Sequence, residues 1–273
     1  MYESCLDTFN NESANQKITT GIKELDDYLH GGIALRKITE FVSKSGNGKT
    51  QMCLQLSLNV QRPKSLGGLE GKALYIDTRQ DFNPLRLKEL ATHLESRWGK
   101  VIPELNATKM VQNVNYVCCP NVPKLIANIL SLDRFLSEQP DIKLIVIDSL
   151  SFSLRMIEEI AERNSVLFEL HNNMRRLLRN NDVALVVTNE LTHRLVRNRF
   201  TISPALGDFH GHLLNERIWF SRAQNSCHGI LVGKTLQSHK LIGLFKIKHD
   251  GINNAIDRTH GNHKAAKRTK MSL

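Results

Sequence analysis

The chain has 273 residues, of which 41% are hydrophobic, so it is long and apolar enough to fold as one large α/β domain. Its net charge of +10 favours a polyanionic partner, most simply nucleic acid. No apolar run reaches membrane-spanning length, and the N-terminus lacks the pattern of a signal peptide. The five cysteines are scattered, without CxxC spacing. We therefore expect a soluble, intracellular protein with reduced cysteines and no membrane partner.

Residues 1–17 are polar, and we expect them to form a flexible N-terminal arm. Phe9 and Ala14 could anchor this arm on a neighbouring molecule, but simple disorder is the favoured interpretation. A short helix follows, and Gly31-Gly32 ends it. The domain core is expected to span 18–257.

A phosphate-binding loop is the strongest local signal in the sequence. The β-branched run Ile38–Val42 breaks into a glycine-rich turn, and an amphipathic helix begins at once. In such a turn, backbone N–H groups and the positive end of the helix dipole face an anion. Lys49 is expected to reach the phosphates, and the Thr50 hydroxyl to bind Mg²⁺. The residues expected to bind nucleotide here are Ser43, Gly46, Asn47, Gly48, Lys49, Thr50 and Gln51.

One residue departs from the full phosphate-loop pattern, which opens with glycine where this chain has Ser43. The alternative interpretation is a plain turn between a strand and a helix, with a solvated lysine at position 49.

The rest of the core alternates strands with helices, which is typical of a largely parallel, twisted sheet flanked by helices. We expect further strands at 73–76, 114–118, 143–147 and 183–187, and helices at 84–94, 122–137 and 157–179. The run at 143–147 is aliphatic enough for a strand buried on both faces, and Asp148 follows it directly. An acid at this edge of an α/β sheet fits a Walker B residue that holds Mg²⁺ together with Thr50.

The C-terminal third combines basic segments with short strands. Residues 193–199 are predicted to form a loop whose Arg194, Arg197 and Arg199 contact DNA phosphates. The alternative for this loop is a purely solubilising role. Strands near 216–220, 229–233 and 241–247 suit an antiparallel extension of the sheet. The tail at 258–273 is basic and expected to be disordered, which suits nuclear import or a nonspecific phosphate contact.

Several stretches resemble the RecA family, and specifically the eukaryotic recombinases and their paralogs, closest to the paralog group usually lettered C. In order they read ITTGIKELDDYLHGGI, TEFVSKSGNGKTQMCLQL, GGLEGKALYIDT, LIVIDS, VVTNELT, PALGDFHGH and LFKIKHDG. The resemblance implies a RecA-type ATPase core that uses ATP and Mg²⁺ in homologous recombination and double-strand-break repair, including meiosis. It further implies a nuclear location and assembly with other paralogs and the main recombinase on single-stranded DNA.

The resemblance also carries individual roles to positions of this sequence. Arg86 matches an arginine that stacks on adenine. Glu190 stands where the family usually has a glutamine that senses the γ-phosphate. Asp250-Gly251 resembles a cap that a neighbouring subunit places over ATP.

The departures from the family concern hydrolysis. Active recombinases place Glu-Gly after the second strand, and the glutamate positions the attacking water, whereas this chain has Arg79-Gln80. Arginine stays charged and cannot accept a proton from water. Asp81 is a possible substitute base. Glu190 replaces a neutral donor with an acceptor-only anion, which is expected to weaken γ-phosphate sensing.

These departures predict a protein that binds ATP to hold an assembly together and hydrolyses it weakly or not at all. Two alternatives stay open. One is a self-filamenting, DNA-dependent ATPase that performs strand exchange. The other, ranked last, is a RecA-like ATPase with no DNA role.

Overall fold

The computed structural model describes residues 4, 16–99, 105–196, 199–233 and 240–255. Most of the predicted N-terminal arm, Arg197 and the basic tail at 258–273 lie outside these described residues.

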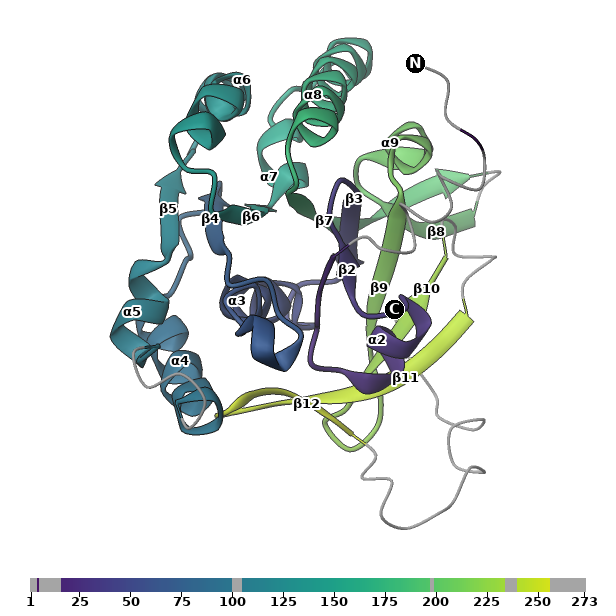
Figure 1. Ribbon diagram of the computed structural model, residues 1–273. Helices are drawn as coiled ribbons and strands as arrows, with labels where there is room; N and C mark the ends of the chain where they lie inside the picture. Colours follow the sequence, from purple (N-terminus) through teal and green to yellow (C-terminus); the bar gives the residue numbers. More distant parts are fainter. Residues whose placement is uncertain (1–3, 5–15, 100–104, 197–198, 234–239, 256–273) are drawn as a thin grey trace.

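One large sheet forms the centre of the fold (Figure 1). Its parallel part runs in the order β9-β3-β7-β6-β4-β5, and an antiparallel part, β10-β11-β12, continues from β9. The parallel strands are β3 (Ile38–Ser43), β4 (Lys72–Asp77), β5 (Val114–Cys118), β6 (Ile142–Asp148), β7 (Ala184–Val196) and β9 (Glu216–Arg222). The antiparallel strands are β10 (His228–Val232), β11 (Lys240–Lys248) and β12 (Gly251–Asn254). This arrangement confirms the predicted fold class.

Helices cover both faces of the sheet (Figure 1). One face packs against α2 (Lys23–Tyr28), α3 (Lys49–Asn59), α4 (Pro84–Trp98) and α5 (Ala107–Gln112). The other face packs against α6 (Val122–Glu138), α7 (Leu150–Leu154), α8 (Ile160–Asn180) and α9 (Gly207–Leu213). Two short strands, β1 (Lys17–Ile18) and β2 (Ile33–Ala34), form a separate ribbon, and the 3-10 turn η1 (Lys64–Leu66) precedes β4.

The strands are apolar at successive positions because both faces of the sheet are buried. In β6, Leu144 and Val146 belong to the core beneath α3, whereas Ile145 and Ile147 belong to the core beneath α8. Side chains of a strand alternate between faces, so a strand with a helix layer on each side needs apolar residues throughout. This explains why the aliphatic runs identified the central strands correctly.

The prediction of a loop at 193–199 is wrong for most of that segment. Strand β7 continues to Val196 and pairs antiparallel with β8 (Arg199–Pro204), with Arg194 opposite Thr201. The sequence around the turn is rich in Leu, Val, Thr, Phe and Ile, which favour paired strands. Arg194 and Arg199 therefore belong to a pair of antiparallel strands, β7 and β8.

Among the described residues, no helix is long and apolar enough to span a membrane.

A buried polar cluster connects five elements of the core. Glu40 in β3 is 0% exposed and accepts a hydrogen bond of 2.7 Å from Asn189 Nδ2 in β7. The Arg217 Nε–H of β9 donates to the other carboxylate oxygen of Glu40, and His210 Nε2 of α9 lies 2.9 Å from the first. His171 Nε2 of α8 lies 2.9 Å from His210 Nδ1. Buried charges persist when they are paired and hydrogen-bonded, as they are here.

The cluster shifts the pKa of two of its members. Burial alone would raise the pKa of Glu40, but His210, Arg217 and Asn189 together lower it to about 2. Burial lowers the pKa of His171 to about 3, and the neighbouring His210 and Arg175 add to this effect. In the folded protein, His171 is therefore still neutral near pH 6.5, where the histidine of an unfolded chain takes up its proton.

This histidine makes the fold sensitive to mild acid. Because the pKa of His171 is lower in the folded chain, the unfolded chain binds more protons between pH 6.5 and about 3, and stability falls as pH falls through that window. The contribution of Glu40 is lost only below its unfolded pKa of about 4.5. We predict that His171 accounts for about 1–2 kcal/mol of the unfolding free energy lost between pH 7 and pH 5.

Urea unfolding of the wild-type chain and the His171→Gln variant at both pH values tests this. The variant should lose less stability between pH 7 and pH 5 than the wild type does. An equal loss in the two proteins would contradict the role assigned to His171.

Candidate nucleotide-binding site

The turn between β3 and α3 has the backbone shape of a phosphate-binding loop. Gly46 has a φ of +80° and Gly48 a φ of +98°, in the left-handed region that favours glycine. A Cβ added at Gly48 would lie 3.0 Å from Ile247 Cδ1, whereas one at Gly46 would meet no atom within 4 Å. The turn thus packs against β11 on one side and is open on the other, where an anion can approach the backbone N–H groups.

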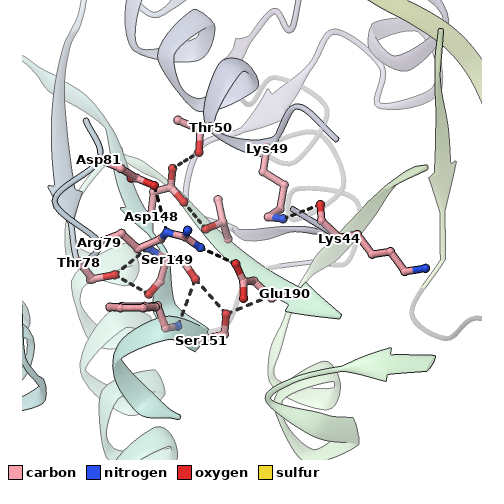
Figure 2. Close-up of polar contacts among 12 residues, drawn as sticks. Lys44, Lys49, Thr50, Thr78, Arg79, Asp81, Asp148, Ser149, Ser151 and Glu190 are labelled. Carbon is pink, nitrogen blue, oxygen red and sulfur yellow. Dashed lines mark hydrogen bonds and ion pairs between the residues drawn. The ribbon is translucent and has the colours of Figure 1, made fainter. Parts of the chain in front are cut away.

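Lys49 lies inside this turn. It is 8% exposed, and its ammonium donates to Ser43 O at 2.9 Å and to Ser43 Oγ at 3.0 Å. It also donates to Lys44 O at 3.3 Å (Figure 2). Burial lowers the pKa of Lys49, and the nearby Glu190 and Asp148 oppose that shift. The alternative of a solvated lysine is therefore wrong.

Asp148 is the polar centre of the site. One of its carboxylate oxygens accepts hydrogen bonds of 2.7 Å from Thr50 Oγ1 and of 2.7 Å from the Tyr75 hydroxyl. The other accepts one of 2.6 Å from Thr188 Oγ1. Burial and the Asp148 charge raise the pKa of Tyr75 well above its usual value, so Tyr75 stays a neutral donor. The predicted pair for Mg²⁺, Thr50 and Asp148, is thus in direct contact.

The residues of the turn and of the strand ends line one cavity of about 270 Å³. The carboxyl ends of β3, β4 and β6 meet here beside the middle of β7 because these strands are parallel, and α/β folds bind ligands at this edge. Ser43 is paired in register with Glu190. The lining residues are Ser45, Gly46, Gly48, Lys49, Thr50, Gln51, Arg79, Asp81, Asp148, Ser149, Glu190 and Ile247. Positive loop groups beside oxygen donors fit a nucleotide phosphate with Mg²⁺.

A cluster of charges closes the side of the cavity opposite Lys49 (Figure 2). Arg79 Nη1 lies 2.5 Å from Glu190 Oε1, and Arg79 Nε lies 3.1 Å from Asp81 Oδ2. Arg155 Nη1 approaches the second oxygen of Glu190 at 3.6 Å. The Arg79 guanidinium also lies over the ring of Phe152, 5.5 Å from its centre.

Comparison with known proteins identifies the family. The family model described as Rad51 matches residues 12–255. The chain belongs to the Rad51 family.

Three relatives give the extent of the similarity. The DNA repair protein RAD51 homolog 3 of Cricetulus griseus is 29% identical over 285 residues, covering 98% of this chain and 78% of the relative. The protein of the same name from Dictyostelium discoideum is 32% identical over 228 residues, covering 78% of this chain and 60% of the relative. The DNA repair and recombination protein RadA of Metallosphaera sedula is 35% identical over 197 residues, covering 71% of this chain and 58% of the relative. The chain thus spans less than two thirds of the last two relatives.

The two departures from the Rad51-family pattern, Arg79 and Glu190, are in contact with each other. The sequence analysis treated them as independent changes. Placed together, they form one ion pair instead of an isolated cation and an isolated anion in a phosphate site. The only hint in the sequence was the opposite charge of Arg79 and Glu190, both of which the family resemblance implies to lie near the γ-phosphate.

Asp81 lines the cavity, as a substitute base would need to. Burial raises the pKa of its carboxyl, with Asp148 and Asp77 adding to the effect and Arg79 opposing it. The same carboxyl is bound to Arg79 Nε. A catalytic role for Asp81 stays a prediction.

Arg86 has a structural role that the sequence analysis missed. Its guanidinium donates to Gln51 Oε1 at 3.0 Å, to His249 O at 2.8 Å and to Lys248 O at 2.7 Å. It therefore ties the turn between β11 and β12 to α3, beside an open cavity that these residues line with Ile247. Stacking of Arg86 on adenine stays a prediction.

Asp250 and the three arginines of 194–199 are the remaining predicted residues. Asp250, in the turn before β12, is 3.5 Å from Arg97 Nη2, and its role as a cap on a neighbour's ATP stays a prediction. Arg194 and Arg199 belong to the hairpin that follows Glu190, and Arg197 lies outside the described residues. Their contact with DNA likewise stays a prediction.

Proposed function

We propose that this chain is a recombinase paralog, closest to the group lettered C and to the insect germline protein spindle-D. In this proposal it binds Mg-ATP and acts in the nucleus in homologous recombination and double-strand-break repair, including meiotic repair. It assembles with other paralogs and the main recombinase on single-stranded DNA. The observation that carries the proposal is the contact of Thr50 with Asp148 beside the buried Lys49, within a Rad51-family fold.

The residues of the cavity have distinct tasks in binding. The open backbone at Gly46 and the ammonium of Lys49 would hold the phosphates, and the oxygens of Thr50 and Asp148 would hold Mg²⁺. When bound, Mg²⁺ neutralises phosphate charge and bridges phosphate oxygens. Lys49 exchanges the loop carbonyls that it now contacts for phosphate oxygens, which are stronger, charge-assisted acceptors.

Weak or absent hydrolysis follows from the charge cluster. A water molecule near the end of the triphosphate would meet the Arg79 guanidinium, which cannot take its proton. Burial, with Asp148 and Asp77, raises the pKa of Asp81, but its Oδ2 is already engaged by that same guanidinium at 3.1 Å, so the oxygen is not free to take a proton from water. A nucleotide that is bound but not consumed stabilises the complex that encloses it by mass action.

The self-filamenting DNA-dependent ATPase is the second candidate, because Asp81 does present a carboxylate to the cavity. A RecA-like ATPase with no DNA role would not explain the net charge of +10 or the arginines of β7 and β8.

Replacing Lys49 tests the nucleotide site. In Lys49→Ala the phosphates lose one charge-assisted partner, and we expect the affinity for Mg-ATP to fall by about a hundredfold in calorimetry. Lys44→Ala is the matched control, because Lys44 is exposed in the same turn and its ammonium points away from the cavity (Figure 2). Its affinity should stay within about threefold of the wild type. Equal affinities of Lys49→Ala and the wild type would refute the assigned site.

Neutralising the hairpin arginines tests the DNA role. We expect binding of a single-stranded oligonucleotide to weaken in a variant with Arg194, Arg197 and Arg199 all changed to Gln. The slope of affinity against salt should fall by about 0.7 for each DNA phosphate that the variant no longer neutralises. Arg134→Gln, which changes an exposed arginine on α6, should leave the slope unchanged. A salt slope that the triple variant shares with the wild type would favour an ATPase with no DNA role at this hairpin.

A further inference from the structure

The Arg79–Glu190 pair is a second charged feature of the nucleotide cavity, separate from Lys49 and the Mg²⁺ residues. Both side chains line the cavity, and each is largely shielded from solvent. Glu190 is fixed within β7, where its backbone pairs with Ser43 at the end of β3 and its N–H donates to Ser151 Oγ at 3.1 Å. Arg79 reaches it from the segment after β4. The pair therefore bridges β7 and the segment after β4 beside the phosphate loop.

The charges that line the cavity show how the Arg79–Glu190 pair can affect phosphate binding. The lining residues include three carboxylates, of Asp81, Asp148 and Glu190, against two cations, Lys49 and Arg79. Asp148 is engaged by three hydroxyl groups and Lys49 by the loop. An additional phosphate group in this cavity would meet Glu190, and the repulsion between the two anions is relieved only by a cation placed between them.

Arg79 can provide that cation, because its present partners are acceptors of the same kind. A guanidinium holds five N–H donors in a planar fork that suits phosphate oxygens as well as carboxylates. Burial alone would lower the pKa of Arg79, but Glu190 and Asp81 raise it, so the side chain stays charged whichever anion it contacts.

Glu190 does not become isolated if Arg79 turns away. Its second oxygen already faces Arg155 Nη1 at 3.6 Å, from the segment between α7 and α8. The carboxylate can therefore exchange one arginine for another without being left unpaired in a partly buried position.

We propose that Arg79 selects nucleoside triphosphates over diphosphates in this protein. The inference rests on the proposed nucleotide site. With the site empty or holding a diphosphate, Arg79 stays on Glu190; with a triphosphate, it moves to the γ-phosphate and Glu190 turns to Arg155. Glu190 is then a positioning residue that competes with the nucleotide for Arg79. It does not touch phosphate itself.

This competition predicts opposite effects for the two partners. Glu190→Gln frees Arg79, so the affinity for a non-hydrolysable ATP analogue should rise by about tenfold. Arg79→Gln leaves Glu190 facing the γ-phosphate without that cation, so the analogue should bind at least about tenfold more weakly. The affinity for ADP should change by less than about threefold in both variants, because the diphosphate lacks the group that Arg79 contacts.

Calorimetry with Mg²⁺ and each nucleotide on the full chain measures these ratios, after thermal melting has verified that each variant is folded. The Arg79→Gln/Glu190→Gln double variant completes the cycle and should lie between the single variants, because neither the attraction nor the repulsion remains. Arg134→Gln, which breaks the exposed Arg134–Glu138 pair on α6, is the control and should leave the ratio of analogue to ADP affinity unchanged.

Amide hydrogen exchange at 191–196 gives a second readout. In the wild type it should differ between the analogue and ADP, and this difference should vanish in Arg79→Gln.

The possible failures are distinguishable. If the wild type binds both nucleotides but the variants change the two affinities by the same factor, selection by Arg79 is wrong while the nucleotide site stands. If the wild type binds neither nucleotide, the proposed function and this inference both fall.

Discussion

The Asp148 carboxylate is where the parts of the nucleotide site are joined. It accepts hydrogen bonds from three hydroxyl groups, those of Thr50 in the phosphate-loop helix, Tyr75 in β4 and Thr188 in β7. These contacts require Tyr75 of β4, Asp148 of β6 and Thr188 of β7 to lie close together in the sheet, which the pairings of β4 with β6 and of β6 with β7 ensure. The carboxylate is 3% exposed, and its three hydroxyl donors satisfy both of its oxygens. The site thus depends on the sheet for its geometry and on Asp148 for its negative centre.

Around this centre, the proposed function assigns nucleotide binding to one set of residues and the weak or absent hydrolysis to another. Lys49, Thr50 and the open backbone at Gly46 match the pattern of a phosphate-binding loop. In the proposed function, Arg79 stands where an active recombinase would carry its catalytic glutamate, and it is paired with Glu190. Such a pair balances one positive charge against one negative charge and presents an arginine, which cannot accept a proton, to the cavity. Under this proposal, binding and turnover depend on different residues of the site.

Local sequence patterns were sufficient for the parts of the fold that local physics determines. The glycine-rich turn, the aliphatic strands and Asp148 could be predicted because each is defined by neighbours in the chain and by burial on both faces. The pairing of β7 with β8 was missed because its arginines suggested a loop, whereas the Leu, Val, Thr, Phe and Ile residues around them favour pairing. Contacts between residues far apart in the chain were beyond such patterns. The Arg79–Glu190 pair joins positions 111 residues apart, and Glu40 gathers partners from α9, β7 and β9. Such pairings are set by the packing of the sheet and cannot be read from either segment alone.

The central proposal for this protein is that its site binds Mg-ATP without hydrolysing it. The most direct measurement is the hydrolysis rate of Mg-ATP by the purified protein, at saturating nucleotide, with and without single-stranded DNA, and with Lys49→Ala as the blank. We predict that the wild type binds Mg-ATP but hydrolyses it no faster than the Lys49→Ala blank, whether or not DNA is present. A robust rate that DNA stimulates and Lys49→Ala abolishes would contradict the account and would assign the catalytic base to Asp81 or to another carboxylate of the site.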